Sequence, residues 1–81
     1  MSWNYRVLAD DSCGDVVFEI YEVYYDKNGN PNGYSEKPSV VISDNKKGLR
    51  WQMNAMKKAL DKPVLFSGDK FPKEYKNTKK Q

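Results

Sequence analysis

The sequence contains no histidine and only one cysteine among its 81 residues. Histidine is the commonest general base and the commonest metal ligand, so its absence removes the usual route to acid–base catalysis and to activation of a serine or cysteine nucleophile. The single cysteine, Cys13, cannot form an internal disulfide, which favours a reducing, cytoplasmic setting. No apolar run approaches the roughly 18–20 residues that span a bilayer, and no basic segment followed by an apolar one opens the chain as in a secretory signal. The sequence therefore predicts a small cytoplasmic protein that is not an enzyme and needs no cofactor.

Charge is divided unevenly along the chain. Residues 1–44 carry eight carboxylates and three cations, a net charge of −5, whereas residues 45–81 carry eleven cations and three carboxylates, a net charge of +8. A chain of this length forms one domain with one small core. Because charges of one sign on a surface attract partners of the opposite sign, the two halves are expected to present two different surfaces.

Three segments have the composition and alternation of β-strands: residues 3–8, 16–26 and 34–43. β-branched and aromatic residues dominate the second segment, but its alternation slips, since Phe18 and Ile20 share a face with Glu22. A bulge near Tyr21 and Glu22 would restore one apolar face. The sequence thus predicts a three-stranded antiparallel meander, which contributes to the core the side chains of Trp3, Tyr5, Val7, Phe18, Ile20 and Val23.

A single helix is expected over residues 45–60, with Ser43 or Asp44 as its N-cap and Pro63 beyond its end. Apolar residues recur at helical spacing in one narrow stripe, Leu49, Met53, Met56 and Leu60, bordered by the smaller or polar residues Gly48, Gln52, Ala55 and Ala59. The apolar run at residues 64–66 either returns to the edge of the sheet or caps the core. The predicted fold class is α+β, with one β-β-β-α domain over residues 1–66 and a Lys-rich flexible tail over residues 67–81.

The loop that begins at Asp26 is similar to the opening of a calcium-binding EF-hand loop. Asp26, Asn28 and Asn30 supply oxygens at its first, third and fifth positions. The sixth position requires glycine and holds Pro31, and the twelfth requires a bidentate glutamate and holds Lys37. The sequence therefore predicts a hairpin loop rather than a metal site.

Basic residues on one face of the expected helix make nucleic acid one candidate partner. At about 100° per residue, Trp51 falls nearly opposite Leu49 and so lies among Lys47 and Lys58. An aromatic ring among cations can stack on a base while the cations meet phosphates, so such a site would use Lys47, Arg50, Trp51 and Lys58. Against this interpretation, Arg50 is the only arginine in the basic set, and the acidic half of the chain repels phosphate.

A large apolar residue on a polar helix face also suits a protein partner. Trp51 is either exposed at such a site or covered by residues 64–66. The open face of the sheet offers tyrosines and carboxylates, which can dock a protein or imitate the spaced charges of a nucleic-acid backbone. We therefore expect protein binding as the principal function, through Tyr21, Glu22, Tyr24 and Trp51. An exposed edge of the third strand could also join two copies in a homodimer.

Three phrases of the chain resemble a family of small uncharacterised proteins from bacteria and phages. They are W-N-Y-R-V at residues 3–7, E-V-Y-Y-D with Gly29 at residues 22–29, and L-D-K-P-V-L at residues 60–65. The resemblance covers residues 3–65 and implies a compact sheet with one helix, whereas the basic tail departs from the family. It implies no activity, so no functional residue is carried over. A phage-type inhibitor or accessory factor that docks on a larger host protein is the expected role.

Overall fold

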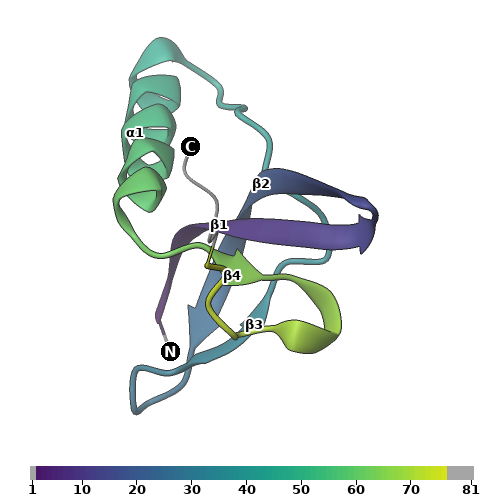
Figure 1. The fold of residues 1–81 in the computed structure, drawn as a ribbon. Helices are drawn as coiled ribbons and strands as arrows, with labels where there is room; N and C mark the ends of the chain where they lie inside the picture. Colours follow the sequence, from purple (N-terminus) through teal and green to yellow (C-terminus); the bar gives the residue numbers. More distant parts are fainter. Residues whose placement is uncertain (1, 77–81) are drawn as a thin grey trace.

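A four-stranded sheet with one helix on one of its faces makes up the protein (Figure 1). The computed structural model describes residues 2–76. In chain order the elements are β1 (Ser2–Cys13), β2 (Asp15–Tyr25), β3 (Pro31–Tyr34), α1 (Lys46–Lys58), the 3-10 turn η1 (Ala59–Asp61), β4 (Leu65–Phe66) and the 3-10 turn η2 (Gly68–Lys70). The strand order is β3-β2-β1-β4, antiparallel from β1 to β3, with β4 parallel to β1. The predicted α+β class, with its meander and single helix, is confirmed.

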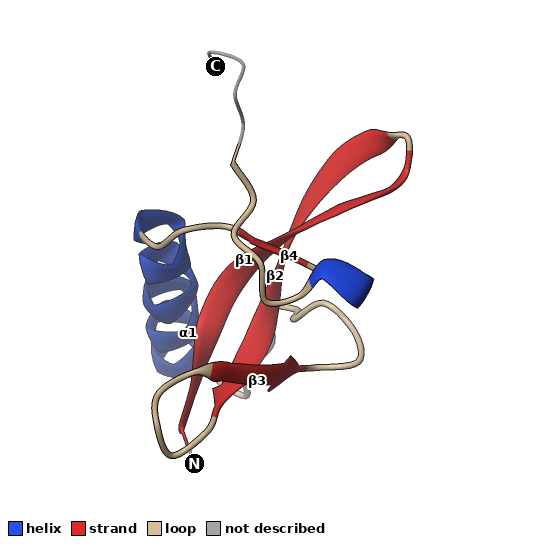
Figure 2. Ribbon diagram, turned by 60° about the horizontal axis from the view of Figure 1, so that its bottom comes forward, coloured by secondary structure: helices blue, strands red, loops and turns tan. Residues whose placement is uncertain are grey.

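The β1–β2 hairpin contains the two longest strands of the sheet, and its end projects beyond the other elements (Figure 2). Its register runs without a shift from Ser2 opposite Tyr25 to Asp10 opposite Val17, so the expected bulge near Tyr21 and Glu22 is wrong. Side chains alternate between faces along each strand. One face, here called the helix face, carries Trp3, Tyr5, Val7, Ala9, Phe18, Ile20, Glu22 and Tyr24; the opposite face carries their neighbours.

Both faces of the sheet bury apolar side chains, which explains why the alternation of β2 slips without a bulge. On the helix face Tyr5 and Val7 pack with Met56 and Ala59, and Ile20 lies against them. On the opposite face a second cluster is buried, Leu8, Val23 and Leu65, with Tyr21, Tyr25, Tyr34 and Phe71 packed around it. Trp3 and Phe18, both expected in the core, are instead exposed, because the helix covers only the middle of its face.

The third strand is much shorter than residues 34–43 and begins earlier, at Pro31. Pro31 lies on an edge strand, where its missing N–H costs no ladder hydrogen bond. Beyond Tyr34, the amides of Ser35 and Ser39 still donate to backbone oxygens of β2 at 2.9 and 2.8 Å, but the chain then leaves the sheet. Residues 40–42 therefore form an exposed linker that leads to the helix, rather than the apolar part of a strand.

The helix begins at Lys46 and is capped by Asn45, whose side chain accepts from the Gly48 amide at 2.8 Å. The expected caps, Ser43 and Asp44, lie just before it. The side of the helix that faces the sheet is also rotated from the predicted stripe: Met56 is 7% exposed, but Met53 and Leu60 are 59% and 69% exposed.

Small residues decide this rotation of the helix. Ala59 is buried and Ala55 is half-buried against the core, and side chains without bulk allow a helix to approach a sheet closely. Gln52 lies on the same side, where its amide donates to the Val40 carbonyl at 2.7 Å and its oxygen accepts from the Ile42 amide at 2.9 Å. The residues predicted to border the apolar stripe thus face inward, and most of the stripe lies at the flank.

The segment after the helix packs on the sheet. Residues 64–66 return to the sheet edge as β4, one of the two predicted alternatives. Phe71 joins the opposite-face cluster, and Tyr75 contacts the rings of Phe18 and Phe66. A flexible tail that starts at residue 67 does not agree with these contacts, because the two aromatic residues give the segment apolar surface to bury. The remainder of the expected tail, residues 77–81, lies outside the described residues.

Candidate functional site

A cleft lined by two tryptophans lies between the start of β1 and the helix. Its volume is about 370 Å³, and its walls are Trp3, Asn4, Tyr5, Trp51, Ala55, Lys58 and Lys62. We call it the Trp cleft. Trp3 and Trp51 are 45% and 62% exposed, and the ring of Trp3 meets that of Tyr5 edge to face at 5.2 Å. Trp51 is therefore not covered by residues 64–66, and both indoles are available to a partner.

The fold explains why these side chains meet. Trp3 and Tyr5 alternate onto the helix face of β1, and Tyr5 is anchored in the core below the helix. Trp51 lies on a flank of α1, four residues before Ala55 and seven before Lys58, so these positions share one side of the helix. Lys62 directly follows η1, and its side chain lines the cleft. The cleft thus has an apolar floor and two ammonium groups at its rim.

A carboxylate lies near the same cleft. Glu22 is the cross-strand partner of Tyr5, and Tyr24 is the partner of Trp3. The Tyr24 hydroxyl donates to the Glu22 carboxylate at 3.1 Å. This hydrogen bond, followed by burial, raises the pKa of Tyr24 above its ordinary value, so the phenol keeps its proton to a higher pH than an ordinary tyrosine does. The surroundings of the Trp cleft therefore carry charges of both signs.

Of the four residues predicted to bind a protein, Trp51 lines the Trp cleft, and Glu22 and Tyr24 lie next to one of its walls. Glu22 and Tyr24 lie on the helix face as the cross-strand partners of Tyr5 and Trp3, which line the cleft, and neither of the two is itself a lining residue. Tyr21 lies on the opposite face and packs at 5.2 Å against the ring of Tyr34. Two of the three predicted sheet residues are thus neighbours of the cleft wall, whereas Tyr21 is on the other face of the sheet.

The predicted nucleic-acid set is divided. Lys58 lines the Trp cleft with Trp51, and Lys47 lies one helical turn before Trp51 on the same side. Arg50 instead lines a separate groove with Leu49 and Met53. The sequence analysis did not predict Trp3 as a binding residue, because Trp3 alternates onto the same face of its strand as the core residues Tyr5 and Val7.

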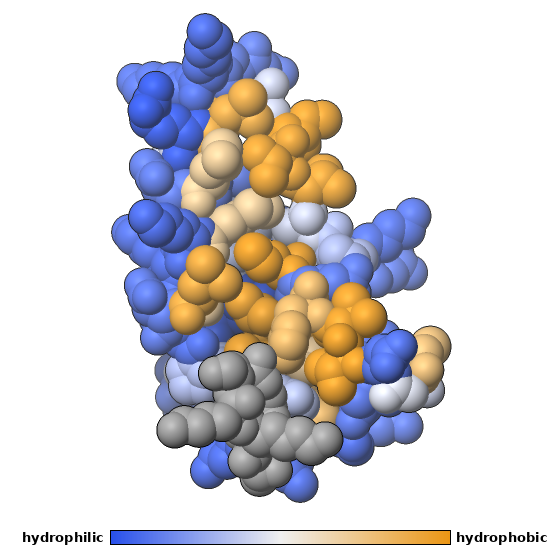
Figure 3. Space-filling view, turned by 45° about the horizontal axis from the view of Figure 1, so that its top comes forward, coloured by the Kyte–Doolittle hydropathy of each residue, from blue (hydrophilic) through white to orange (hydrophobic). Residues whose placement is uncertain are grey.

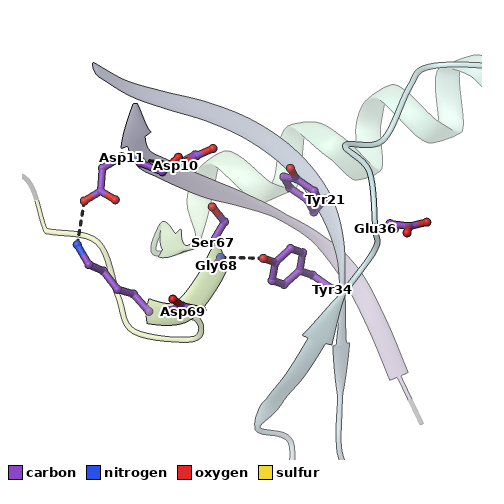
Figure 4. Close-up of a pocket in the computed structure, with 10 residues that line it drawn as sticks. Asp10, Asp11, Tyr21, Tyr34, Glu36, Ser67, Gly68 and Asp69 are labelled. Carbon is purple, nitrogen blue, oxygen red and sulfur yellow. Dashed lines mark hydrogen bonds and ion pairs between the residues drawn. The ribbon is translucent and has the colours of Figure 1, made fainter. Parts of the chain in front are cut away.

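A second, larger hollow of about 470 Å³ lies on the opposite face of the sheet (Figure 4). Tyr21 and Tyr34 come from β2 and β3, and residues 67–70 close the other side. The Tyr34 hydroxyl accepts from the Gly68 amide at 2.7 Å, which ties η2 to the sheet. Four carboxylates line the hollow against one lysine: Asp10, Asp11, Glu36 and Asp69, with Lys70.

Hydrogen bonds, burial and nearby charge shift the pKa values of two groups in this acidic hollow, Asp10 and Tyr21. Asp10 accepts from the hydroxyl and the amide of Ser12, and these bonds lower the pKa of its carboxyl. Burial and the nearby Glu19 raise the pKa of Tyr21. Lys70 is paired with Asp11 at 2.9 Å, and both side chains are about half exposed. The hollow therefore presents mainly carboxylates, beside the phenol rings of Tyr21 and Tyr34.

The loop after β2 folds as a turn stabilised by its own first residue. The Asp26 carboxylate accepts from the amides of Asn28 and Asn30 at 2.9 and 3.0 Å. An EF-hand would use this oxygen to bind calcium, whereas here it binds the backbone of its own loop. Within residues 2–76, no group of three or more histidine, cysteine, aspartate or glutamate side chains is arranged to hold a metal ion. No helix in this part of the chain is long and apolar enough to cross a membrane.

Comparisons with known proteins give no relative. No family model matches the chain, and neither the curated proteins nor the solved structures contain a significant match. The resemblance of residues 3–65 to small bacterial and phage proteins stays a prediction, and the function must be argued from the surfaces themselves.

Proposed function

We propose that this protein is a non-catalytic binding domain that docks on another protein through the Trp cleft. The observation that carries the proposal is the pairing of Trp3 and Trp51, two exposed indoles, across a concave site of about 370 Å³. Tryptophan is the residue most enriched among those that dominate the energy of protein interfaces. Exposing two of them around one hollow is unfavourable in water unless a partner covers them.

The partner we propose is a protein segment with an apolar or aromatic anchor side chain next to a carboxylate. The anchor would fill the cleft between the indoles, and the carboxylate would meet Lys58 and Lys62. Glu22 and the Tyr24 hydroxyl would accept hydrogen bonds from the same segment. A small inhibitor or accessory factor that occupies a site on a larger host protein fits this arrangement.

Charges of both signs favour a protein over a nucleic acid at this site. A phosphate backbone is attracted by Lys58 and Lys62 but repelled by Glu22, whereas a peptide offers groups that suit both. Arginine is the residue that reads bases most often, and Arg50 lies outside the cleft. Nucleic-acid binding through Lys47, Arg50, Trp51 and Lys58 is therefore the alternative that the experiment must separate.

Affinity capture from the native host, followed by titration of the purified partner, tests the proposal. Trp51→Ala should weaken binding by at least about thirtyfold, the effect of losing an interface hot spot of roughly 2 kcal/mol. Lys27→Ala, an exposed change in the loop after β2 and outside both the Trp cleft and the helix, serves as the control and should leave binding within about twofold. Equal affinity of wild type and Trp51→Ala for every captured partner would show that the Trp cleft is not the docking site.

A single-stranded oligonucleotide provides the second arm. Under the protein-binding proposal it should bind weakly at roughly 50 mM salt and should not depend on Trp51. Tight binding that falls steeply with salt, and that is lost in Trp51→Ala and in Lys58→Gln, would favour the nucleic-acid function instead.

A further inference from the structure

The flank of the helix on the other side from Trp51 leaves apolar side chains uncovered. Met53 and Leu60 are exposed along this side, Leu49 is half-buried in line with them, and Met56 from the same stripe is buried. We call Leu49, Met53 and Leu60 the apolar flank. The linker lies next to it, held to Gln52 by two hydrogen bonds, and Val40, Val41 and Ile42 are exposed there. Figure 3 shows the resulting band of hydrophobic side chains running beside the charged side of the helix.

Cations border the apolar flank on its solvent side. A groove of about 380 Å³ is lined by Lys46, Leu49, Arg50, Met53 and Asn54. Lys57 follows Met53 by four residues and so continues the same border. The helix contains no carboxylate between Lys46 and Lys58. The flank therefore combines an apolar stripe with a row of positive charge.

We propose that the apolar flank binds an amphipathic helix of a partner protein whose apolar stripe is bordered by aspartate or glutamate. Side chains at helical spacing are the surface into which a second helix packs its own ridges. From Leu49 to Leu60 the flank is about 16 Å long at 1.5 Å per residue, which matches three turns of a partner helix. Carboxylates beside the partner's stripe would pair with Lys46, Arg50 and Lys57.

Charge separates this occupant from a second copy of the chain. Two copies joined through the same flank would bring Lys46, Arg50 and Lys57 toward their own counterparts, and such juxtaposition of like charges disfavours association. An acidic helix gains from the same cations. The inference is independent of the Trp cleft, because Trp51 and Met53 lie on different sides of the helix.

A pair of synthetic peptides of about 16 residues tests the proposal on the full-length, isotope-labelled protein. Both place leucines at helical spacing; one carries glutamate at the bordering positions and the other carries lysine. The acidic peptide should bind with amide shifts concentrated at residues 46–60, and the lysine peptide should bind at least about tenfold more weakly. Met53→Glu should weaken the acidic peptide by about tenfold or more, whereas Met53→Leu should keep its affinity within about threefold.

Further measurements keep the outcome clear. Circular dichroism should show the same fold for Met53→Glu, since this side chain is already 59% exposed. Trp51→Ala should bind the acidic peptide as wild type does, so that failure of the Trp cleft and failure of the apolar flank are distinguishable. No binding at roughly 1 mM peptide, or equal binding of the two peptides, would overturn the proposal.

Two other results would assign the flank to a different occupant. Sedimentation of a dimer that Met53→Glu dissociates would assign it to a second copy. Binding to vesicles that contain phosphatidylserine, lost in Met53→Glu and not competed by the acidic peptide, would assign it to an anionic membrane surface.

Discussion

Arg6 is a buried charge that has no carboxylate partner within residues 2–76. It lies on the opposite face of β1, where it is 8% exposed. Its guanidinium donates to the Tyr25 hydroxyl at 2.9 Å and to the Pro63 carbonyl at 2.7 Å, and its Nε has no partner among the described residues. The first bond joins β1 to β2, and the second joins β1 to the segment between η1 and β4. Arg6 therefore links the first strand to the segment that precedes the last strand. Substitutions can separate the contribution of its packing to stability from that of its hydrogen bonds.

Replacing Arg6 by alanine should lower the free energy of unfolding by about 2–4 kcal/mol, because a cavity forms and the Pro63 carbonyl loses its donor. Arg6→Met should recover part of this loss, since its side chain fills much of the volume without burying a charge. Urea denaturation measures both, with Lys27→Ala as an exposed control that should stay within about 0.5 kcal/mol of wild type. If Arg6→Met is as unstable as Arg6→Ala, the stability that Arg6 contributes comes from its hydrogen bonds rather than from its packing.

The pair of Glu22 and Tyr24 can be tested through the protonation of the phenol. Because the Glu22 carboxylate accepts from the Tyr24 hydroxyl and raises the pKa of Tyr24, Glu22→Gln should lower that pKa toward its ordinary value. A pKa raised by folding favours the folded state at pH values below the unfolded pKa, and this contribution is lost as the pH rises through the folded-state pKa. Tyrosine ring resonances followed from neutral to alkaline pH give the measurement.

The neighbouring tyrosine supplies the control for this titration. Burial first, and then Glu19, raise the pKa of Tyr21 on the other face of the sheet. Glu19→Gln should therefore move the Tyr21 titration downward and leave that of Tyr24 in place. A Tyr24 titration that does not respond to Glu22→Gln would mean that the hydrogen bond is absent in solution.

At the scale of elements, the helix shows that the pattern of large apolar residues predicts where a helix forms but not which of its sides packs on the sheet. The spacing of Leu49, Met53, Met56 and Leu60 correctly predicts a helix, because the apolar residues recur with its period. The same spacing gives the wrong buried side, since it counts only large apolar residues. Close approach to the sheet depends on small side chains, and Gln52 adds hydrogen bonds that a hydrophobic pattern does not register.

Met53 and Met56 provide a matched test of the helix orientation. Met56→Ala should lower the free energy of unfolding by about 2–4 kcal/mol, because its side chain is 7% exposed and packs with Tyr5 and Val7. Met53→Ala should change it by less than about 1 kcal/mol, since that side chain is mostly in water. Thermal and urea unfolding of the two variants measure the difference. Equal losses would place the predicted stripe, and not its small-residue border, against the sheet.

Considered as a whole, the molecule keeps its two charged halves largely apart. The described residues contain one ion pair, Lys70 with Asp11, and both of its side chains are substantially exposed. The carboxylates gather mainly on the hairpin and around the acidic hollow, whereas the helix carries cations alone. Charge in this protein therefore contributes more to the choice of partners than to the stability of the fold.

Stability should accordingly depend little on this ion pair. Lys70→Met should lower the free energy of unfolding by less than about 1 kcal/mol, as is usual for exposed pairs. Urea unfolding at low and at high sodium chloride checks this, and the difference between wild type and variant should shrink further as salt screens the pair. A loss above roughly 2 kcal/mol that disappears in high salt would show that the two halves do stabilise each other.

The sequence alone determined the α+β class, the long second strand, the single helix and the division of charge. Each of these depends on local periodicity or composition, which short-range physics controls. Only the tertiary structure decided that both faces of the sheet bury apolar side chains and that Ala59 is buried against the sheet. It also decided that Phe71 and Tyr75 pack on the sheet and that Trp3 and Trp51 line one cleft. These features depend on contacts between residues far apart in the chain, and in them a few close-fitting side chains outweigh the pattern that the larger apolar residues suggest.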